Sequence, residues 1–106
     1  MKSKETQALE TLKALADANR LETLLMLREG ELCSCKILEH FNISQPTLSY
    51  HMKVLLEAGL VEKRKDSQRT LYRLKMETLD SLSAFLLSIC STSQSAANTI
   101  HEESMS

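Results

Sequence analysis

The sequence contains no tryptophan, one proline and two glycines, and only 4% of its 106 residues are aromatic. β-Sandwiches and β-barrels need many turns and many β-branched or aromatic side chains, so this composition argues against both. Leucine and alanine supply most of the 42% of residues that are hydrophobic. The composition therefore predicts a mainly α-helical chain that forms one small domain.

A long hydrophobic run is also lacking. No stretch approaches the roughly 20 apolar residues that cross a bilayer, and the first residues lack the apolar segment of a signal peptide. We therefore expect a cytoplasmic protein with no membrane partner. Three cysteines are an odd number in a reducing compartment, which argues against a disulfide framework and leaves ligand, redox or buried-thiol roles open.

The charges are unevenly distributed along the chain. The formal net charge of −1 would not attract nucleic acid, but residues 44–75 carry +4 whereas the rest of the chain carries −5. A basic segment in an otherwise acidic protein is expected where one face of the molecule meets phosphate groups.

A helix-turn-helix is the main structural prediction. Apolar side chains recur at helical spacing in residues 32–41, and again after Ser44, whose hydroxyl can accept hydrogen bonds from the first free amides of a helix. Gly59 can end this second helix by adopting a positive φ angle. About three residues connect the two helices, which is typical of a helix-turn-helix.

Two helices are expected before this unit and one well after it. Leucines at helical spacing from Leu9 to Leu15 predict the first helix, and Asp17 and Gly30 bracket the second. Residues 79–89 carry a leucine-rich seam at near-heptad spacing and predict the last helix.

A β-hairpin is expected between the helix-turn-helix and the last helix. The β-leaning runs 60–64 and 70–74 flank a polar turn. The chain is thus predicted to be a winged helix-turn-helix, mainly α with a β-hairpin wing, in one domain over residues 1–90. Serine and threonine make up seven of the residues 91–106, so we expect a flexible tail there.

The second helix of the predicted pair has side chains suited to reading DNA. In a helix-turn-helix this helix lies in the major groove, with its N-terminal side chains against base edges. Its non-core side is expected to present Gln45, Thr47, Ser49, Tyr50, His51 and Lys53. Gln45 and Ser49 are the preferred base readers. A solvated face without a ligand has the same pattern, and for His51 a surface or capping role is the more common one.

The hairpin tip adds Arg64, Lys65 and Arg69 as a basic wing. These side chains could contact the DNA backbone or enter the adjacent minor groove, and each is expected to contact phosphate. Because the helix, the hairpin and the basic segment occur together in this order, the sequence predicts double-stranded DNA as a partner.

Three segments together resemble the ArsR/SmtB family of metal-responsive repressors: LKALADANRLETLL, then ELCSC, then ISQPTLSYHMKVLLEAGLVEKRKDSQRTLYRL. They cover roughly residues 9–75. The resemblance implies a homodimer joined through its first and last helices, which represses transcription from operator DNA until an inducer binds. The seam at 79–89 fits that dimer interface, although an intramolecular core would give the same spacing.

The ELCSC segment is similar to the arsenic- and cadmium-sensing motif of that family and implies a thiol site at Cys33 and Cys35. Soft thiolates suit thiophilic ions. Residues two apart in a regular helix point about 200° away from each other, so both sulfurs could bind one ion only if the helix or its first turn were distorted. Such a distortion would shift the protein away from its DNA-binding conformation and relieve repression.

The ligand set departs from the arsenic-sensing branch at one position. In that branch a third cysteine often follows three residues after the second, where this chain has Leu38. Two thiolates could suffice if arsenic keeps a hydroxide or methyl substituent. Alternatively, Cys90 could complete the site across the fold or between subunits, or it could be an inert buried thiol.

Arsenite, antimonite or a trivalent organoarsenical is the inducer that the sequence favours, and no organic cofactor is expected. The histidines of the family's zinc site are absent between Met76 and Cys90, as are the N-terminal cysteines of its cadmium and lead sensors. The alternatives are a cadmium or lead sensor and a redox switch at Cys33 and Cys35, although a direct bond between helical residues two apart would be strained. An enzyme is disfavoured, because no Gly-rich phosphate loop, acidic pair or Ser-His-Asp order is evident.

Overall fold

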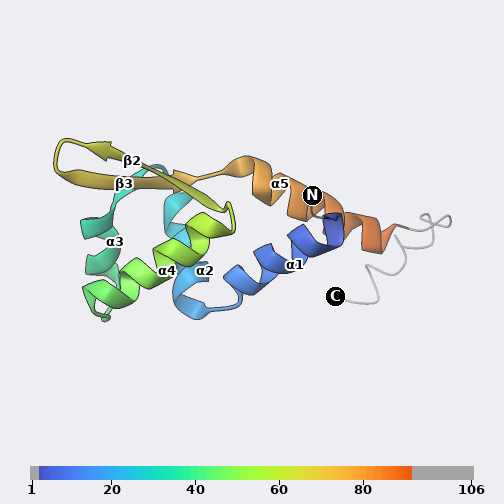
Figure 1. Cartoon of the computed structure of the whole chain (residues 1–106), viewed down its shortest axis with the longest axis horizontal. Coiled ribbons are helices and arrows are strands. Elements are labelled where there is room, and N and C mark those ends of the chain that lie inside the picture. The colour runs from blue at the N-terminus through green and yellow to red at the C-terminus, as the bar shows by residue number, and fades with distance from the viewer. Residues whose placement is uncertain (1–2, 92–106) are drawn as a thin grey trace.

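The computed structural model describes residues 3–91, so the tail that the sequence predicts lies almost wholly outside the described residues. In chain order the elements are α1 (Lys4–Leu15), α2 (Ala18–Leu27), β1 (Leu32–Cys33), α3 (Ser34–His40), α4 (Gln45–Glu57), β2 (Val61–Asp66), β3 (Arg69–Leu74) and α5 (Met76–Cys90). α1 and α5 lie side by side at one end of the molecule, and the β2–β3 hairpin extends at the other end beside α3 (Figure 1). This arrangement is the predicted winged helix-turn-helix. No helix within residues 3–91 is both long and apolar enough to cross a membrane.

Local capping chemistry sets the ends of the helices. Oδ2 of Asp17 accepts a hydrogen bond from the Arg20 N–H at 3.1 Å where α2 begins, and Oγ of Ser44 accepts one from the Thr47 N–H at 3.2 Å where α4 begins. Gly59 follows α4 with a φ angle of 75°, which few other residues adopt at low cost. The predicted starts at Asp17 and Ser44 and the predicted stop at Gly59 are therefore confirmed.

The helix-turn-helix of α3 and α4 packs on a core that it shares with α1, α2 and the sheet. The segment 41–44 connects the two helices. Buried apolar side chains from all of these elements form one cluster: Ala14, Leu24, Leu27, Ile37, Leu48, Met52, Leu55, Leu60, Val61 and Tyr72. Because one face of α4 is buried in this cluster, its opposite face is left for solvent or a ligand.

The three strands form one antiparallel sheet in the order β1-β3-β2, in which β2 and β3 are the predicted hairpin. The sequence pattern did not predict β1. The helix expected over residues 32–41 begins only at Ser34, because the backbone of Cys33 pairs with Leu71 of β3 instead of entering the helix.

Alternation along the strands gives the sheet two different faces. Val61 and Tyr72 belong to the core and define the face toward the helices. Cys33, Leu71 and Arg64 lie on the opposite, outer face, where they stand in register across β1, β3 and β2. The outer face therefore carries both a thiol and a wing arginine, with one leucine between them.

α5 buries only part of its apolar surface. Leu82 is buried, whereas Leu87 and Ile89 are 63% and 66% exposed, and the neighbouring α1 also exposes leucines. The seam at residues 79–89 is therefore not simply an intramolecular core.

Candidate DNA-binding face and thiol site

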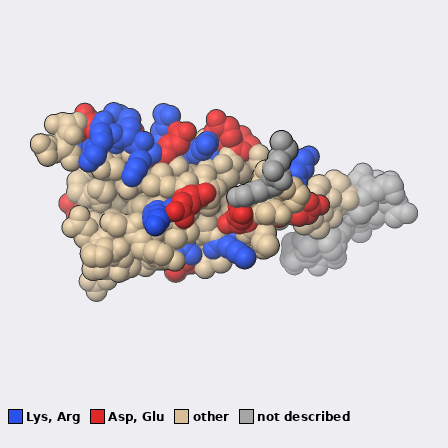
Figure 2. All heavy atoms as spheres, viewed as in Figure 1, with Lys and Arg blue, Asp and Glu red and all other residues tan. Residues whose placement is uncertain are grey.

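The exposed side of α4 is polar. Five of the predicted DNA-reading side chains are exposed there: Gln45, Thr47, Ser49, Tyr50 and Lys53. Thr47 differs from the others, because its Oγ1 accepts a hydrogen bond from the Ser44 hydroxyl at 2.9 Å and so takes part in the cap of α4. In the view of Figure 2, few charged groups lie over α3 and the first turns of α4, whereas lysine and arginine gather over the hairpin.

His51 does not lie on this exposed side. It is only 8% exposed, its Nδ1 lies 3.1 Å from Nη1 of Arg20, and its Nε2 lies 3.9 Å from Oδ2 of Asp17. Because a guanidinium group can only donate, Nδ1 accepts this hydrogen bond and the proton of the neutral ring is on Nε2, toward Asp17. The prediction that His51 reads DNA is therefore wrong, since the helix turns this residue toward α2.

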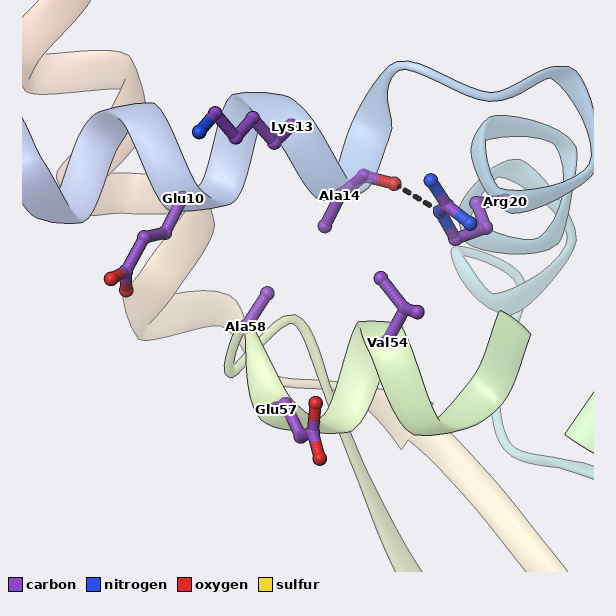
Figure 3. A pocket seen from close by; sticks show the side chains of 7 residues that line it. All are labelled: Glu10, Lys13, Ala14, Arg20, Val54, Glu57 and Ala58. Atoms are coloured by element: carbon purple, nitrogen blue, oxygen red, sulfur yellow. Dashed lines mark hydrogen bonds between the residues drawn. The ribbon is translucent and has the colours of Figure 1, made fainter. Parts of the chain in front are cut away.

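Arg20 connects His51 to the corner between α1 and α2. Its Nε donates a hydrogen bond of 2.6 Å to the carbonyl oxygen of Ala14. Ala14 and Arg20 line one side of a hollow of about 460 Å³, and Val54 of α4 lies on the other side (Figure 3). The hydrogen bond from the Arg20 N–H is the main reason that the pKa of Asp17 lies below its ordinary value of 3.8. These contacts thus attach the buried side of α4, through His51, to Asp17 and Arg20 at the start of α2.

The wing presents two lysines on the face that points toward the helices. Lys63 and Lys65 are exposed and share their strand face with Val61, which packs in the core. Within residues 3–91 neither lysine has an ion-pair partner. Lys65 was among the predicted phosphate contacts, whereas Lys63 was not, although the strand alternation could have indicated it.

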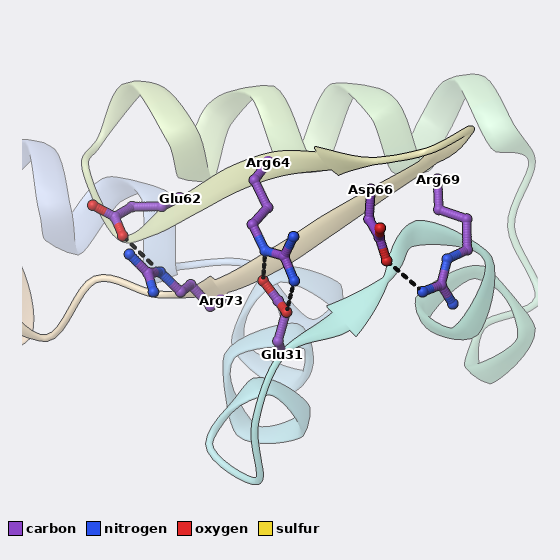
Figure 4. Close-up of polar contacts among 6 residues, drawn as sticks. All are labelled: Glu31, Glu62, Arg64, Asp66, Arg69 and Arg73. Atoms are coloured by element: carbon purple, nitrogen blue, oxygen red, sulfur yellow. Dashed lines mark hydrogen bonds and ion pairs between the residues drawn. The ribbon is translucent and has the colours of Figure 1, made fainter.

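Arg64 and Arg69 project from the outer face instead. Nε and Nη2 of Arg64 donate to the two carboxylate oxygens of Glu31 at 2.8 and 2.9 Å, and Nη2 of Arg69 donates to Asp66 at 2.9 Å (Figure 4). Each arginine would have to share its guanidinium with a carboxylate, or release that carboxylate, in order to contact phosphate. The role of both arginines at DNA remains a prediction.

The two cysteines meet at the start of α3. Cys33 is the N-cap of this helix, with a φ angle of −77° and a ψ angle of 156°, and its Sγ accepts a hydrogen bond from the Lys36 N–H at 3.4 Å. Cys35 lies in the first turn and is exposed. The structure joins the two sulfurs as a disulfide, with 5.3 Å between the Cα atoms.

This geometry corrects two expectations about the thiols. The angle of about 200° between residues two apart applies only when both lie in a helix, and Cys33 precedes the first helical residue, Ser34. The sulfurs of Cys33 and Cys35 therefore face each other without any unwinding of α3, and the geometric objection to a direct bond between them does not apply. The premise of the expected distortion, that both cysteines lie in a regular helix, is therefore wrong.

A third thiol from the same chain does not reach this site. Cys90 is the last residue of α5, at the opposite end of the molecule from α3 (Figure 1), so completion of the site within one chain by Cys90 is wrong. Leu38, in the position of a third ligand, packs against the core. Among the described residues no group of three or more His, Cys, Asp or Glu side chains could hold a metal ion. Within one chain the site consists of two thiols.

Comparisons with known proteins agree on one family. Residues 10–63 match the family described as "Bacterial regulatory protein, arsR family". The chain is 48% identical over 86 residues to an arsenical resistance operon repressor of Staphylococcus xylosus, covering 81% of this chain and 83% of that protein. It is 52% identical over 71 residues to the repressor of the same description in Staphylococcus aureus, covering 67% and 68%. A solved structure described as a "Possible transcriptional regulator for arsenical resistance" superposes with a TM-score of 0.71 and 31% identity, covering 85% of this chain and 94% of that one.

Proposed function

The chain belongs to the ArsR family of bacterial regulatory proteins, and on this premise we propose that it is a homodimeric repressor of an arsenical-resistance operon. The family consists of DNA-binding transcriptional regulators and not of enzymes. Arsenite or antimonite is the inducer, and it releases the repressor from its operator by binding Cys33 and Cys35.

The position of the two thiols at the start of α3 carries this proposal. Their Cα atoms are 5.3 Å apart and both side chains point to one place, so one arsenic atom can reach both sulfurs. Two hydroxyl groups of arsenous acid are replaced by the two sulfurs, each leaving with a thiol proton as water, and no electron is transferred. Because the site has two thiols, arsenic keeps its third hydroxyl group, or a methyl group in an organoarsenical.

The thiol site also lies where it can act on DNA binding. Cys33 caps α3, the first helix of the helix-turn-helix, and its backbone pairs with β3 of the wing. A ligand that favours a different placement of Cys33 therefore changes the populations of conformations in which α4 and the wing fit DNA together.

The proposed DNA contacts are of two kinds. Gln45 and Ser49 contact base edges in the major groove, and the wing cations Arg64, Lys65 and Arg69 contact phosphates. The exposed leucines of α1 and α5 support a homodimer interface formed by the first and last helices. A twofold dimer would present its two α4 helices to two half-sites of a palindromic operator.

A mobility-shift titration tests the proposal. The reduced protein is bound to the promoter region of its own operon, and arsenite, antimonite, cadmium, lead and zinc are added in separate series. We expect arsenite and antimonite to release the DNA at the lowest concentrations. Release by cadmium or lead alone would overturn the choice of inducer.

Cysteine variants assign the site. Cys33→Ser and Cys35→Ser are expected to keep operator affinity and to lose release by arsenite, because one thiol cannot hold arsenic firmly. Cys90→Ser is the matched control and should respond like the parent chain, since Cys90 lies at the far end of α5. An unchanged arsenite dose dependence in either of the first two variants would show that the site is elsewhere.

A redox-sensing repressor is the second candidate, because Cys33 and Cys35 are close enough to be joined as a disulfide. Hydrogen peroxide would oxidise the two thiols to the disulfide and would itself be reduced to two water molecules. Mass spectrometry separates the two candidates: arsenite adds the mass of an arsenic adduct, whereas peroxide removes the mass of two hydrogens. DNA release by peroxide at concentrations below those needed for arsenite would favour the redox candidate.

A further inference from the structure

We propose that Glu31 couples the thiol site to the DNA-binding wing through its ion pair with Arg64. The inference rests on the proposed function, because it takes Cys33 and Cys35 as the inducer site. It adds a positioning residue that does not touch the inducer and that lies outside the exposed face of α4.

The pair spans the sheet from one edge to the other. Glu31 lies two residues before Cys33 and reaches over β3 to Arg64 on β2, with two hydrogen bonds of 2.8 and 2.9 Å (Figure 4). Directly beside it, Cys33 pairs with Leu71, and Leu71 pairs with Arg64. The inducer site and the wing arginine are thus joined by one row of the sheet and by one ion pair next to that row.

Glu31 is the acidic residue that ties the thiol-bearing segment to the hairpin. Among the described residues the outer face carries two other pairs, Arg73 with Glu62 and Arg69 with Asp66, and both lie within the hairpin itself. β1 has only two residues, so its backbone pairing with β3 is short.

The inducer reaches this pair through Cys33. Sγ of Cys33 caps α3 by accepting a hydrogen bond from the Lys36 N–H. In the proposed mechanism, arsenic bound to this sulfur changes its position and its hydrogen bonding. Glu31 is only two residues away along an extended segment, so its carboxylate moves with the backbone of Cys33.

Arg64 is oriented by this carboxylate while it still has donors for DNA. A guanidinium group has five N–H donors, and Glu31 engages two of them, which leaves three for a phosphate oxygen. In the repressing state Glu31 holds Arg64 in place for this contact. Displacement of Glu31 by the inducer removes that orientation and weakens the hold of the wing on DNA.

The test compares Glu31→Gln with Glu62→Gln. Both substitutions remove one negative charge from the same face of the sheet, and both break an ion pair with an arginine, but only the first acts on the thiol segment. Operator affinity is measured with and without arsenite by fluorescence anisotropy, and the ratio of the two dissociation constants gives the coupling. Arsenic bound per chain is counted by mass spectrometry.

For the parent chain we expect a coupling ratio within the usual allosteric range of roughly 5- to 150-fold. Glu31→Gln should lower that ratio by about threefold or more, which lies within the range expected for the loss of one exposed ion pair. The variant should still bind one arsenic per chain. Glu62→Gln should stay within about twofold of the parent ratio. Arg64→Gln should lower the ratio by a similar factor, and the double variant Glu31→Gln with Arg64→Gln should lower it no further, because both residues act through one ion pair.

The outcomes separate the two levels of the proposal. If arsenite releases the parent chain and Glu31→Gln equally well, the coupling role of Glu31 is wrong and the proposed function stands. Effects of Glu31→Gln and Arg64→Gln that add up in the double variant would also count against it. If arsenite does not release the parent chain at all, the proposed function fails, and this inference fails with it.

Discussion

The imidazole of His51 is held between two charged groups of the α2 N-terminus. Arg20 donates to its Nδ1, and its Nε2 points toward Asp17. Two neighbours of His51 on α4, Tyr50 and Lys53, are exposed. One turn of the same helix thus contains a side chain that fixes the helix and side chains that are free to contact DNA, and only their directions distinguish them.

Asp17 allows a prediction about acid stability. Its folded pKa lies below 3.8, so the ionised carboxylate stabilises the fold above pH 3.8, and this stabilisation is lost as the pH falls through the folded pKa. Asp17→Asn keeps an oxygen that can cap α2 but carries no charge. We expect it to lower the free energy of unfolding by about 0.3–1 kcal/mol at pH 7, and by progressively less below pH 3.8. Urea unfolding at a series of pH values measures this difference.

Asp17→Ala is the control for that experiment. It removes the capping hydrogen bond as well as the charge, so its cost of about 1 kcal/mol should largely persist at low pH. A difference between the parent chain and Asp17→Asn that stayed constant with pH would mean that the charge of Asp17 has no part in stability.

Because side chains alternate along a strand, the two faces of the hairpin carry different basic residues. On the face toward the helices, Lys63 and Lys65 have no acidic partner among the described residues, whereas the arginines of the outer face are each paired with a carboxylate. A phosphate can therefore bind the lysines without displacing another anion. The density of basic residues along the chain overstates how many of them are free for DNA.

Lys65→Ala is accordingly expected to weaken binding to operator and random DNA by similar factors. The slope of log K against log salt should fall by about 1, as for one lost phosphate contact. Arg69→Ala should have the same kind of effect but a smaller one, because Arg69 already has Asp66 as a partner. Binding titrations at several salt concentrations measure both slopes, and a loss confined to one DNA sequence would contradict a phosphate role.

At the scale of the whole molecule, α1 and α5 form one end, and the first turns of α4, α3 and the β2–β3 hairpin form the other (Figure 1). The exposed apolar side chains of α5 and α1 lie at the first end, far from the wing. A second copy of the chain covering this end would leave both copies of α4 uncovered, which is the arrangement that a twofold operator requires.

Leu87→Glu tests this assembly. Leu87 is exposed in the single chain, so the substitution should change the free energy of unfolding of the monomer by no more than about 0.5 kcal/mol. If the side chain is buried between subunits, its loss costs about 1.5–3 kcal/mol of association per subunit. Sedimentation velocity should then show a monomer at concentrations where the parent chain is dimeric.

Leu25→Glu is the matched control, since it changes an exposed leucine on α2 in the same way. It should leave the association state unaltered. Equal effects of Leu25→Glu and Leu87→Glu, or none from either, would remove the support for an interface on α1 and α5.

Local sequence was enough to predict the helices, the helix-turn-helix and the hairpin, because each depends on neighbours. The cap at Ser44 acts over three residues, Gly59 supplies its own backbone conformation, and helical periodicity repeats within one element. The exposed polar side of α4 followed from the same periodicity, and family resemblance pointed to Cys33 and Cys35.

Only the tertiary structure decided which way particular side chains of the site face. Cys33 lies outside the helix because its backbone pairs with Leu71 of β3. Arg64 donates hydrogen bonds to the carboxylate of Glu31, which is 33 residues away in sequence. His51 turned from the predicted DNA face because Arg20, 31 residues away, donates to it. Periodicity along one segment cannot reveal partners on another, because pairing across a sheet or between helices depends on how the whole chain packs.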